Sequence, residues 1–188
     1  MGRTKRPLSQ SSCRGYNFRE GGHFAHKIMT RASIISWKTR APPTQRAPLG
    51  FAETFTDIDG ESIMQGFIPS AMEDKWFICF DDEWLLFHRS WSGFCIYGLR
   101  LERSPDGLRV SESWVNRDPN QQSGTDVEYD RKLVRFLIDA FLLRRPDCRF
   151  PMPSNVKEDH PAGILQHHLV GRAYPEDRSN PSNVPNDG

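Results

Sequence analysis

The amino-acid sequence predicts an α+β fold, an antiparallel meander of four or more strands with one main helix packed on the sheet. Residues 75–101 contain three apolar segments separated by a charged turn and a glycine turn, as in consecutive antiparallel strands. Residues 108–116 alternate apolar and polar side chains with the two-residue period of a fourth strand. Residues 126–144 carry apolar side chains three and four positions apart, which is typical of an amphipathic helix.

The length of 188 residues suits one domain with tails. We expect a single folded domain at 51–176, preceded by a basic segment at 1–50 and followed by a polar tail at 177–188 that is disordered by composition. The basic segment holds ten of the 25 Lys and Arg residues but only one of the 24 acidic residues. The rest of the chain is therefore acidic. This composition disfavours generic nucleic-acid binding by the folded domain, because an acidic body repels a phosphate backbone.

Several interpretations of residues 1–50 stay open. Their composition is typical of a disordered basic tail or an upstream extension ahead of Met29, with a mitochondrial transit peptide as the alternative. An arm that binds nucleic acid or a membrane surface is a third reading. The four cysteines show no CxxC spacing, and the chain has neither a signal-peptide core nor an apolar run of membrane-spanning length. A reduced, cytoplasmic setting is expected.

The folded domain is expected to open with residues 51–74. The dipeptide Asp59-Gly60 predicts a hairpin turn, because Asp-Gly suits the positive φ of such turns. A calcium loop is disfavoured, since the twelfth position counted from Asp57 is Ile68 rather than glutamate. Strands then follow at 76–80, 84–89, 94–101 and 108–116, with turns at 81–83, 90–93 and 104–107.

The helix at 126–144 has recognisable ends. Thr125 and Glu128 have the spacing of a capping box, in which each side chain satisfies a free backbone N–H of the first turn. Pro146 ends the helix. A last short element is expected within residues 163–174.

The second strand indicates how the layers are arranged. Neighbouring strand residues face opposite sides, so His88 and Arg89 point to different faces of the sheet. Both faces of this strand are largely apolar, which implies a second covering layer opposite the helix. In the structural interpretation, His88 bonds a backbone carbonyl and Arg89 pairs with Asp118 or Asp81.

In the functional interpretation, the ends of the second and fourth strands meet at one end of the meander and form a ligand-binding rim. Arginine forks recognise phosphate and carboxylate groups, and tryptophan offers a stacking face. The residues of this predicted rim are Arg89, Ser90, Trp91, Asn116, Arg117, Asp118 and, more distantly, Arg172.

No cofactor or metal site is expected. His167 and His168 are adjacent, so they cannot both face one ion, and nucleophile elbows, P-loops and dinucleotide-binding glycine motifs are missing. His88 is the candidate for a general acid or base, and one of His167 and His168 is the alternative that would act with it across the fold.

The string AMEDKWFICFDDEWLLFHRSWSGFCIYGLRLE, followed by SWVNRDP, FPMP and LQHHLVGRAYP, resembles a small uncharacterised α+β family. Its members include stand-alone bacterial-type proteins and domains joined to ADP-ribose-processing domains. The resemblance covers residues 51–176 and implies a compact domain, with an association with NAD or ADP-ribose chemistry. It supplies no catalytic residues.

Three functions therefore remain open from the sequence. The first is a binding module for an anionic small ligand, such as a nucleotide or ADP-ribose moiety, or for a protein partner at the predicted rim. The second is a small hydrolase or transferase in which His88 is the general acid or base and Arg89 and Arg117 hold the anion. The third is a protein-interaction domain with an exposed aromatic patch. The enzyme requires His88 in an open cleft, whereas the other functions are compatible with a buried His88.

Overall fold

The computed structural model describes residues 31–153 and 163–177. A six-stranded antiparallel sheet has the order β1-β6-β5-β4-β3, with β2 paired to β6. The elements are β1 (Arg46–Pro48), β2 (Thr54–Phe55), α1 (Asp57–Gln65), β3 (Trp76–Asp81), β4 (Trp84–Arg89), β5 (Cys95–Ser104), β6 (Gly107–Asn116), α2 (Val127–Leu137), the π-helical turn η1 (Ile138–Leu142), β7 (Phe150–Pro151), α3 (Ile164–Leu169) and β8 (Glu176–Asp177). The predictions for residues 1–30 and 178–188 fall outside the described residues.

The predicted meander is confirmed. Strands β3 to β6 pair antiparallel in chain order, and each turn is made by residues that tolerate its backbone conformation. Asp82 and Glu83 have positive φ between β3 and β4, as a two-residue hairpin turn requires. Aspartate tolerates this conformation well, whereas glutamate is less common there. Gly107 has φ 122° where β6 begins, a conformation that favours glycine.

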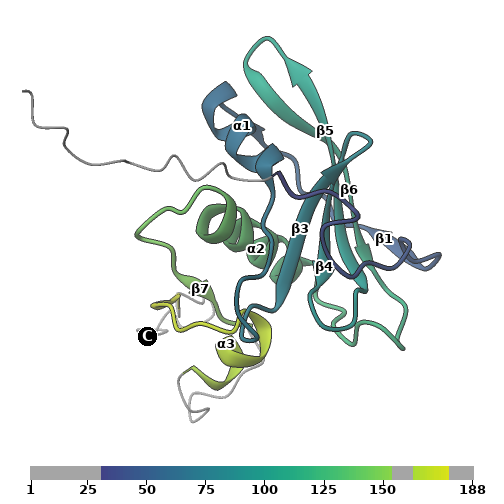
Figure 1. Ribbon diagram of the computed structural model, residues 1–188, viewed down its shortest axis with the longest axis vertical. Coiled ribbons are helices and arrows are strands. Elements are labelled where there is room, and N and C mark those ends of the chain that lie inside the picture. Colours follow the sequence, from purple (N-terminus) through teal and green to yellow (C-terminus); the bar gives the residue numbers. More distant parts are fainter. Residues whose placement is uncertain (1–30, 154–162, 178–188) are drawn as a thin grey trace, which may run out of the picture.

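The predicted main helix is present as α2, which continues directly into η1 and packs on one face of the sheet (Figure 1). Its N-cap is Asp126 rather than Thr125. The Asp126 carboxylate accepts hydrogen bonds from the backbone N–H groups of Glu128 and Tyr129 at 3.0 and 3.1 Å. A carboxylate at this place satisfies two free donors and also suits the positive end of the helix dipole.

The predicted hairpin turn at Asp59-Gly60 is wrong. These residues lie inside α1, whose N-cap Thr56 accepts a 3.2 Å hydrogen bond from the Asp59 N–H. Gly60 serves close packing instead of a turn, because a Cβ at this position would lie 3.0 Å from the Cβ of Leu108 on β6. The glycine therefore lets the helix approach the sheet closely.

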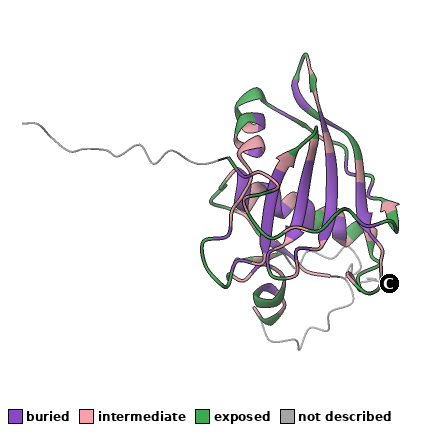
Figure 2. Cartoon of the chain, turned by 45° about the vertical axis from the view of Figure 1, so that its right-hand side comes forward, coloured by how far each residue is buried: buried purple, intermediate pink, exposed green. Residues whose placement is uncertain are grey.

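The sheet is covered on both faces, as the apolar β4 pattern predicted. The helix side holds the larger core, with Leu85 and Phe87 of β4 packed among residues of α2 and η1. On the other side Leu86, Trp114 and Ala32 belong to a smaller cluster of buried residues, which we call the second core. Figure 2 shows the resulting continuous burial along the central strands.

The second covering layer is the segment 31–45, which crosses the face of the sheet opposite α2 (Figure 1). Backbone hydrogen bonds fix it at both ends, from the N–H of Ala32 to the carbonyl of Gln65 and from the N–H of Arg40 to the carbonyl of Gly93, each 2.8 Å. Strand β1 then pairs with β6. Residues 31–50, which the sequence assigns to the basic tail, thus pack on the folded domain. Ala32 and Ile34 join the core opposite α2, and Leu49 joins the core on the helix side.

The late element predicted within 163–174 is the short helix α3. It is held to the meander by the carbonyl oxygen of Leu169, which accepts hydrogen bonds from the Trp76 indole at 2.7 Å and from Arg89 at 3.0 Å. In the described part of the chain, no helix is long and apolar enough to cross a membrane.

Candidate functional site

The strand ends that form the predicted rim do lie together. Tyr97 on β5 pairs with Phe87 on β4 and with Val115 on β6, so β4 and β6 finish at the same end of the sheet. Residues 90–93 and the loop after Asn116 therefore leave the sheet at one end. Their side chains, however, turn to different partners.

His88 is fully buried on the face opposite α2. Its Nδ1 lies 3.1 Å from the carbonyl oxygen of Gly93, which can only accept, so Nδ1 donates this bond. The ring packs against Phe77 at a centroid distance of 6.0 Å, and Nε2 has no hydrogen-bond partner among the described residues. Burial lowers the pKa of His88 and keeps the ring neutral. A general acid or base must reach its substrate, and this side chain reaches none.

Arg89 projects to the helix side and forms ion pairs with neither Asp118 nor Asp81. Its guanidinium lies 4.2 Å from the ring centroid of Trp76 and donates to the carbonyl of Leu169. An arginine stacked on indole and bonded to the last carbonyl groups of a helix stabilises that helix end. Arg89 therefore holds α3 in place.

Arg117 also turns inward. One of its nitrogens is 2.7 Å from the carboxylate of Asp130, which is nearly fully buried in the first turn of α2, and another donates to the carbonyl of Gly124 at 2.9 Å. The other carboxylate oxygen of Asp130 accepts a 2.8 Å hydrogen bond from Tyr97. This network joins β5, the loop after β6 and α2.

Asn116 and Asp118 shape that loop. The Asn116 side chain is buried, donates to the carbonyl of Cys95 at 2.9 Å and accepts from the Asp118 N–H at 2.8 Å. The Asp118 carboxylate in turn accepts from the Asn120 N–H at 3.0 Å. The polar atoms that these contacts use are directed into the loop or toward β5, which leaves them poorly placed for a ligand.

Ser90 and Arg172 meet at Asp74. The Ser90 hydroxyl donates to the Asp74 carbonyl at 2.6 Å, and Arg172 pairs with the Asp74 carboxylate at 2.7 Å. The carboxylate also accepts from the N–H groups of Ser70 and Ala71. Burial alone would raise the pKa of Asp74, but these donors and Arg172 outweigh it and lower the pKa. Asp74 thus fixes the loop 70–74.

Trp91 is the one residue of the predicted rim whose large apolar side chain stays open to solvent. It is 62% exposed, yet its indole N–H donates a 3.0 Å hydrogen bond to the carbonyl of Met72. Met72 is itself 75% exposed, and the half-exposed Trp37 donates from its indole to the carbonyl of Ser90 at 2.9 Å. We call the side chains of Trp37, Met72 and Trp91 the Trp91 surface.

Cations surround the Trp91 surface. The ammonium of Lys75 lies 4.8 Å from the centroid of the Trp91 ring, and Lys38 donates to the Trp91 carbonyl at 3.1 Å. Arg40 donates to the carbonyl of Ser92 at 3.1 Å. Within the described residues these three cations form no ion pair with a carboxylate. Glu73, which follows Met72 in the chain, is exposed, and the three cations outnumber it.

Sequence reasoning missed most of this surface. Trp37 and Lys38 were assigned to the basic tail, although the apolar cluster Ile34-Ile35 with Trp37 is unusual for a solvated tail. Met72 gave no signal of its own, because the loop that positions it is fixed by the buried carboxylate of Asp74, which accepts from the N–H groups of Ser70 and Ala71. Composition alone does not reveal such loop contacts.

The thiols of Cys79 and Cys95 offer no alternative chemistry. Cys79 is buried, and desolvation raises its pKa to about 12, while burial also raises the pKa of Cys95. Neither forms the thiolate that a nucleophile requires. Among the described residues, no three His, Cys, Asp or Glu side chains are placed to hold a metal ion.

No protein family, curated protein or solved structure matches the chain. The resemblance drawn from the FHRSW and SWVNRDP strings therefore stays a prediction.

Proposed function

We propose that the protein is a protein-interaction domain that binds an acidic, apolar segment of a partner on the Trp91 surface. The observation that carries this proposal is that an exposed tryptophan is held in one orientation. The hydrogen bond to Met72 and the contact with Lys75 fix the indole. A rigid exposed aromatic side chain is typical of interface hot spots, since little conformational entropy is lost when a partner covers it.

The charge around the indole selects the partner. Lys38, Arg40 and Lys75 bring three cations to the surface, and they outnumber the exposed Glu73 that follows Met72 in the chain. A partner segment with apolar side chains flanked by Asp or Glu would complement both features. The chain's own residues 1–30 are basic, so like charges disfavour them as the occupant.

A small anionic ligand at the predicted rim is less well supported. Arg89, Arg117 and Arg172 bond Leu169, Asp130 and Asp74 respectively. A ligand would have to replace these internal contacts before it gained any of its own. The enzyme alternative loses its acid or base, because His88 is sealed inside the second core.

The test is selection of peptides from a random display library on the full chain, followed by affinity measurement. We expect selected peptides to combine Asp or Glu with large apolar residues and to lose about tenfold or more in affinity with Trp91→Ala. Ile58→Ala is the matched control, because Ile58 is a large apolar side chain that is exposed on α1, at 80%, away from the Trp91 surface. It should leave affinity unchanged.

Three results would overturn the proposal. Peptides that bind Trp91→Ala as well as the natural chain would place recognition elsewhere. If removal of residues 1–30 strengthens peptide binding, the chain's own segment occupies the Trp91 surface. If light scattering shows dimers, and Trp91→Ala abolishes them, the occupant of the Trp91 surface is a second copy of the chain.

A further inference from the structure

A groove on the outer side of α2 is separate from the Trp91 surface. Its cavity volume is about 460 Å³, within the range of roughly 300–1,000 Å³ that is usual for small-molecule sites. The loop 50–53 forms one wall, the segment 148–151 forms the other, and α2 lies between them. We call this cavity the α2 groove.

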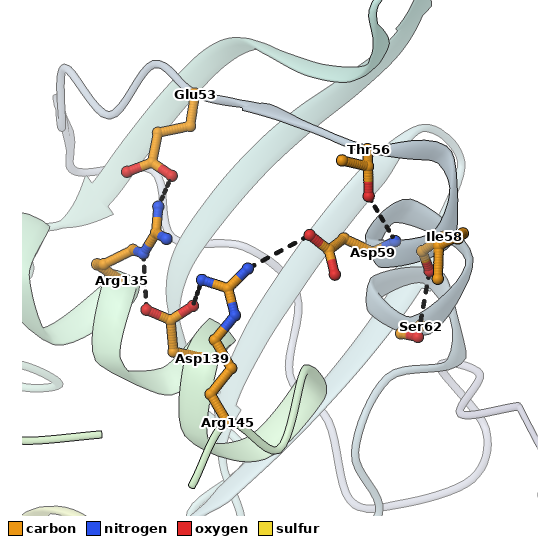
Figure 3. A network of polar contacts seen from close by, with 8 residues as sticks. All are labelled: Glu53, Thr56, Ile58, Asp59, Ser62, Arg135, Asp139 and Arg145. Carbon is orange, nitrogen blue, oxygen red and sulfur yellow. Dashed lines mark hydrogen bonds and ion pairs between the residues drawn. The ribbon is translucent and has the colours of Figure 1, made fainter. Parts of the chain in front are cut away.

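The carboxylates of the α2 groove are already engaged. Arg135 pairs with Glu53 and, at 2.8 Å, with Asp139, and Arg145 pairs with the other oxygen of Asp139 at 2.9 Å (Figure 3). Glu128 pairs with Arg131 at 2.6 Å. The remaining acid of the lining, Asp177, is not free either. These groups are therefore poor partners for a cationic ligand.

Two cations of the lining remain unpaired. Lys132 on α2 and Arg149 in the segment 148–151 are exposed, and neither forms an ion pair or side-chain hydrogen bond within the described residues. The lining has as many cationic as acidic side chains, but two of its cations have no acidic partner. An oxyanion is the group that two free cations in one groove would recognise.

The rest of the lining is apolar. Phe51 and Phe136 are 6% and 4% exposed and lie at the bottom of the groove, while Pro151 and Ala52 line its walls. Aromatic and proline side chains offer flat contact surfaces for a ring. The groove therefore combines a place for a ring with two free positive charges.

We propose that the α2 groove binds a small organic anion, a planar ring that carries a phosphate or a carboxylate. Phe51, Phe136 and Pro151 contact the ring, and Lys132 and Arg149 hold the oxyanion. The ion pairs of Arg135 with Glu53 and Asp139 hold the lining of the groove in place and do not contact the ligand. This site is independent of the proposed peptide-binding function.

The experiment is NMR titration of the isotope-labelled full chain with AMP and benzoate as probes, which present the two oxyanions. At least one of them should shift the amide signals of Ala52, Lys132 and Arg149. The neutral counterparts adenosine and benzamide should bind about tenfold more weakly, because they lack the charge. Inorganic phosphate alone should also bind more weakly than AMP, because it makes no ring contacts.

The deciding variant is the double substitution Lys132→Ala with Arg149→Ala, which should lower affinity for the binding probe about tenfold or more. Arg103→Ala with Arg109→Ala removes two positive charges from exposed positions on β5 and β6, outside the groove, and should leave probe binding unchanged. The proposal is overturned if neither probe shifts the groove amides. It is equally overturned if the two double variants weaken binding alike, since the effect is then one of net charge.

Discussion

The phenolic O–H of Tyr97 donates a 2.8 Å hydrogen bond to the carboxylate of Asp130, and both residues are buried. This bond joins the middle of the sheet to the first turn of α2. The second oxygen of Asp130 pairs with Arg117 at 2.7 Å. A buried carboxylate with both oxygens satisfied fixes how the helix sits on the sheet, because any other arrangement would leave a charge unpaired.

Tyr97→Phe should therefore lower the free energy of unfolding by about 1–3 kcal/mol, the cost of removing one partner of a buried acceptor. Urea denaturation at neutral pH measures it. Tyr129→Phe is the matched control, since the Tyr129 hydroxyl is buried without a hydrogen-bond partner among the described residues. Its removal should cost much less. Equal losses in the two variants would show that the Tyr97–Asp130 bond contributes nothing of its own.

Asp74 should make part of the stability depend on acid pH. The folded-state pKa of Asp74 is lowered, so its contribution is complete above the unfolded pKa of about 3.9 and is lost as pH falls through the folded pKa. Unfolding measured from pH 7 to pH 2 should show a shallower acid loss in Asp74→Asn than in the natural chain. Asp106→Asn, in the exposed β5–β6 turn, is the control and should keep the steeper loss. If all three proteins lose the same free energy of unfolding as pH falls, Asp74 does not have this role.

Local pattern was sufficient to predict the meander and the main helix. Strands β3 to β6 follow each other through short turns, so period and turn residues specify the pairing without long-range information. The same logic predicted that β4 is covered on both faces. The prediction failed at Gly60. An Asp-Gly dipeptide usually indicates a turn, but here the glycine lies in a helix because Leu108 leaves no room for a side chain.

The candidate site could be predicted only in outline. The convergence of the strand ends followed from topology, but Arg89 and Arg172 have partners 80 and 98 residues away in the sequence, and Arg117 turns to a carboxylate of the next helix. An arginine fork suits a ligand and a buried carboxylate equally well, so residue type alone could not decide between them. The exposed indole of Trp91 depends on Met72 and Lys75 in the same way.

Gly98 should tolerate no side chain. It pairs with Leu86 and Trp114 in the middle of the sheet, and a Cβ there would overlap the Trp114 ring. Gly98→Ala should destabilise the protein by roughly 1–3 kcal/mol or more, because the ring must leave its packed position. Thermal unfolding measures the loss. Gly124→Ala is the control, since only the flexible end of Gln122 is near a Cβ at that exposed position. An unchanged midpoint for Gly98→Ala would mean that Trp114 moves freely, contrary to its burial.

His88 should make stability fall between neutral and mildly acidic pH. Burial lowers the pKa of His88 in the folded protein. Below the unfolded pKa of about 6.5, the unfolded chain therefore binds a proton that the folded chain does not bind. The free energy of unfolding should decrease as pH falls through that value and level off below the folded pKa. In His88→Asn an amide donor can still reach the carbonyl of Gly93 while the titrating group is gone, so this decrease should be smaller. His167→Asn, at an exposed position on α3, is the control and should keep it. If His88→Asn retains the full decrease, another group is responsible, and His88 must reach solvent in the folded protein.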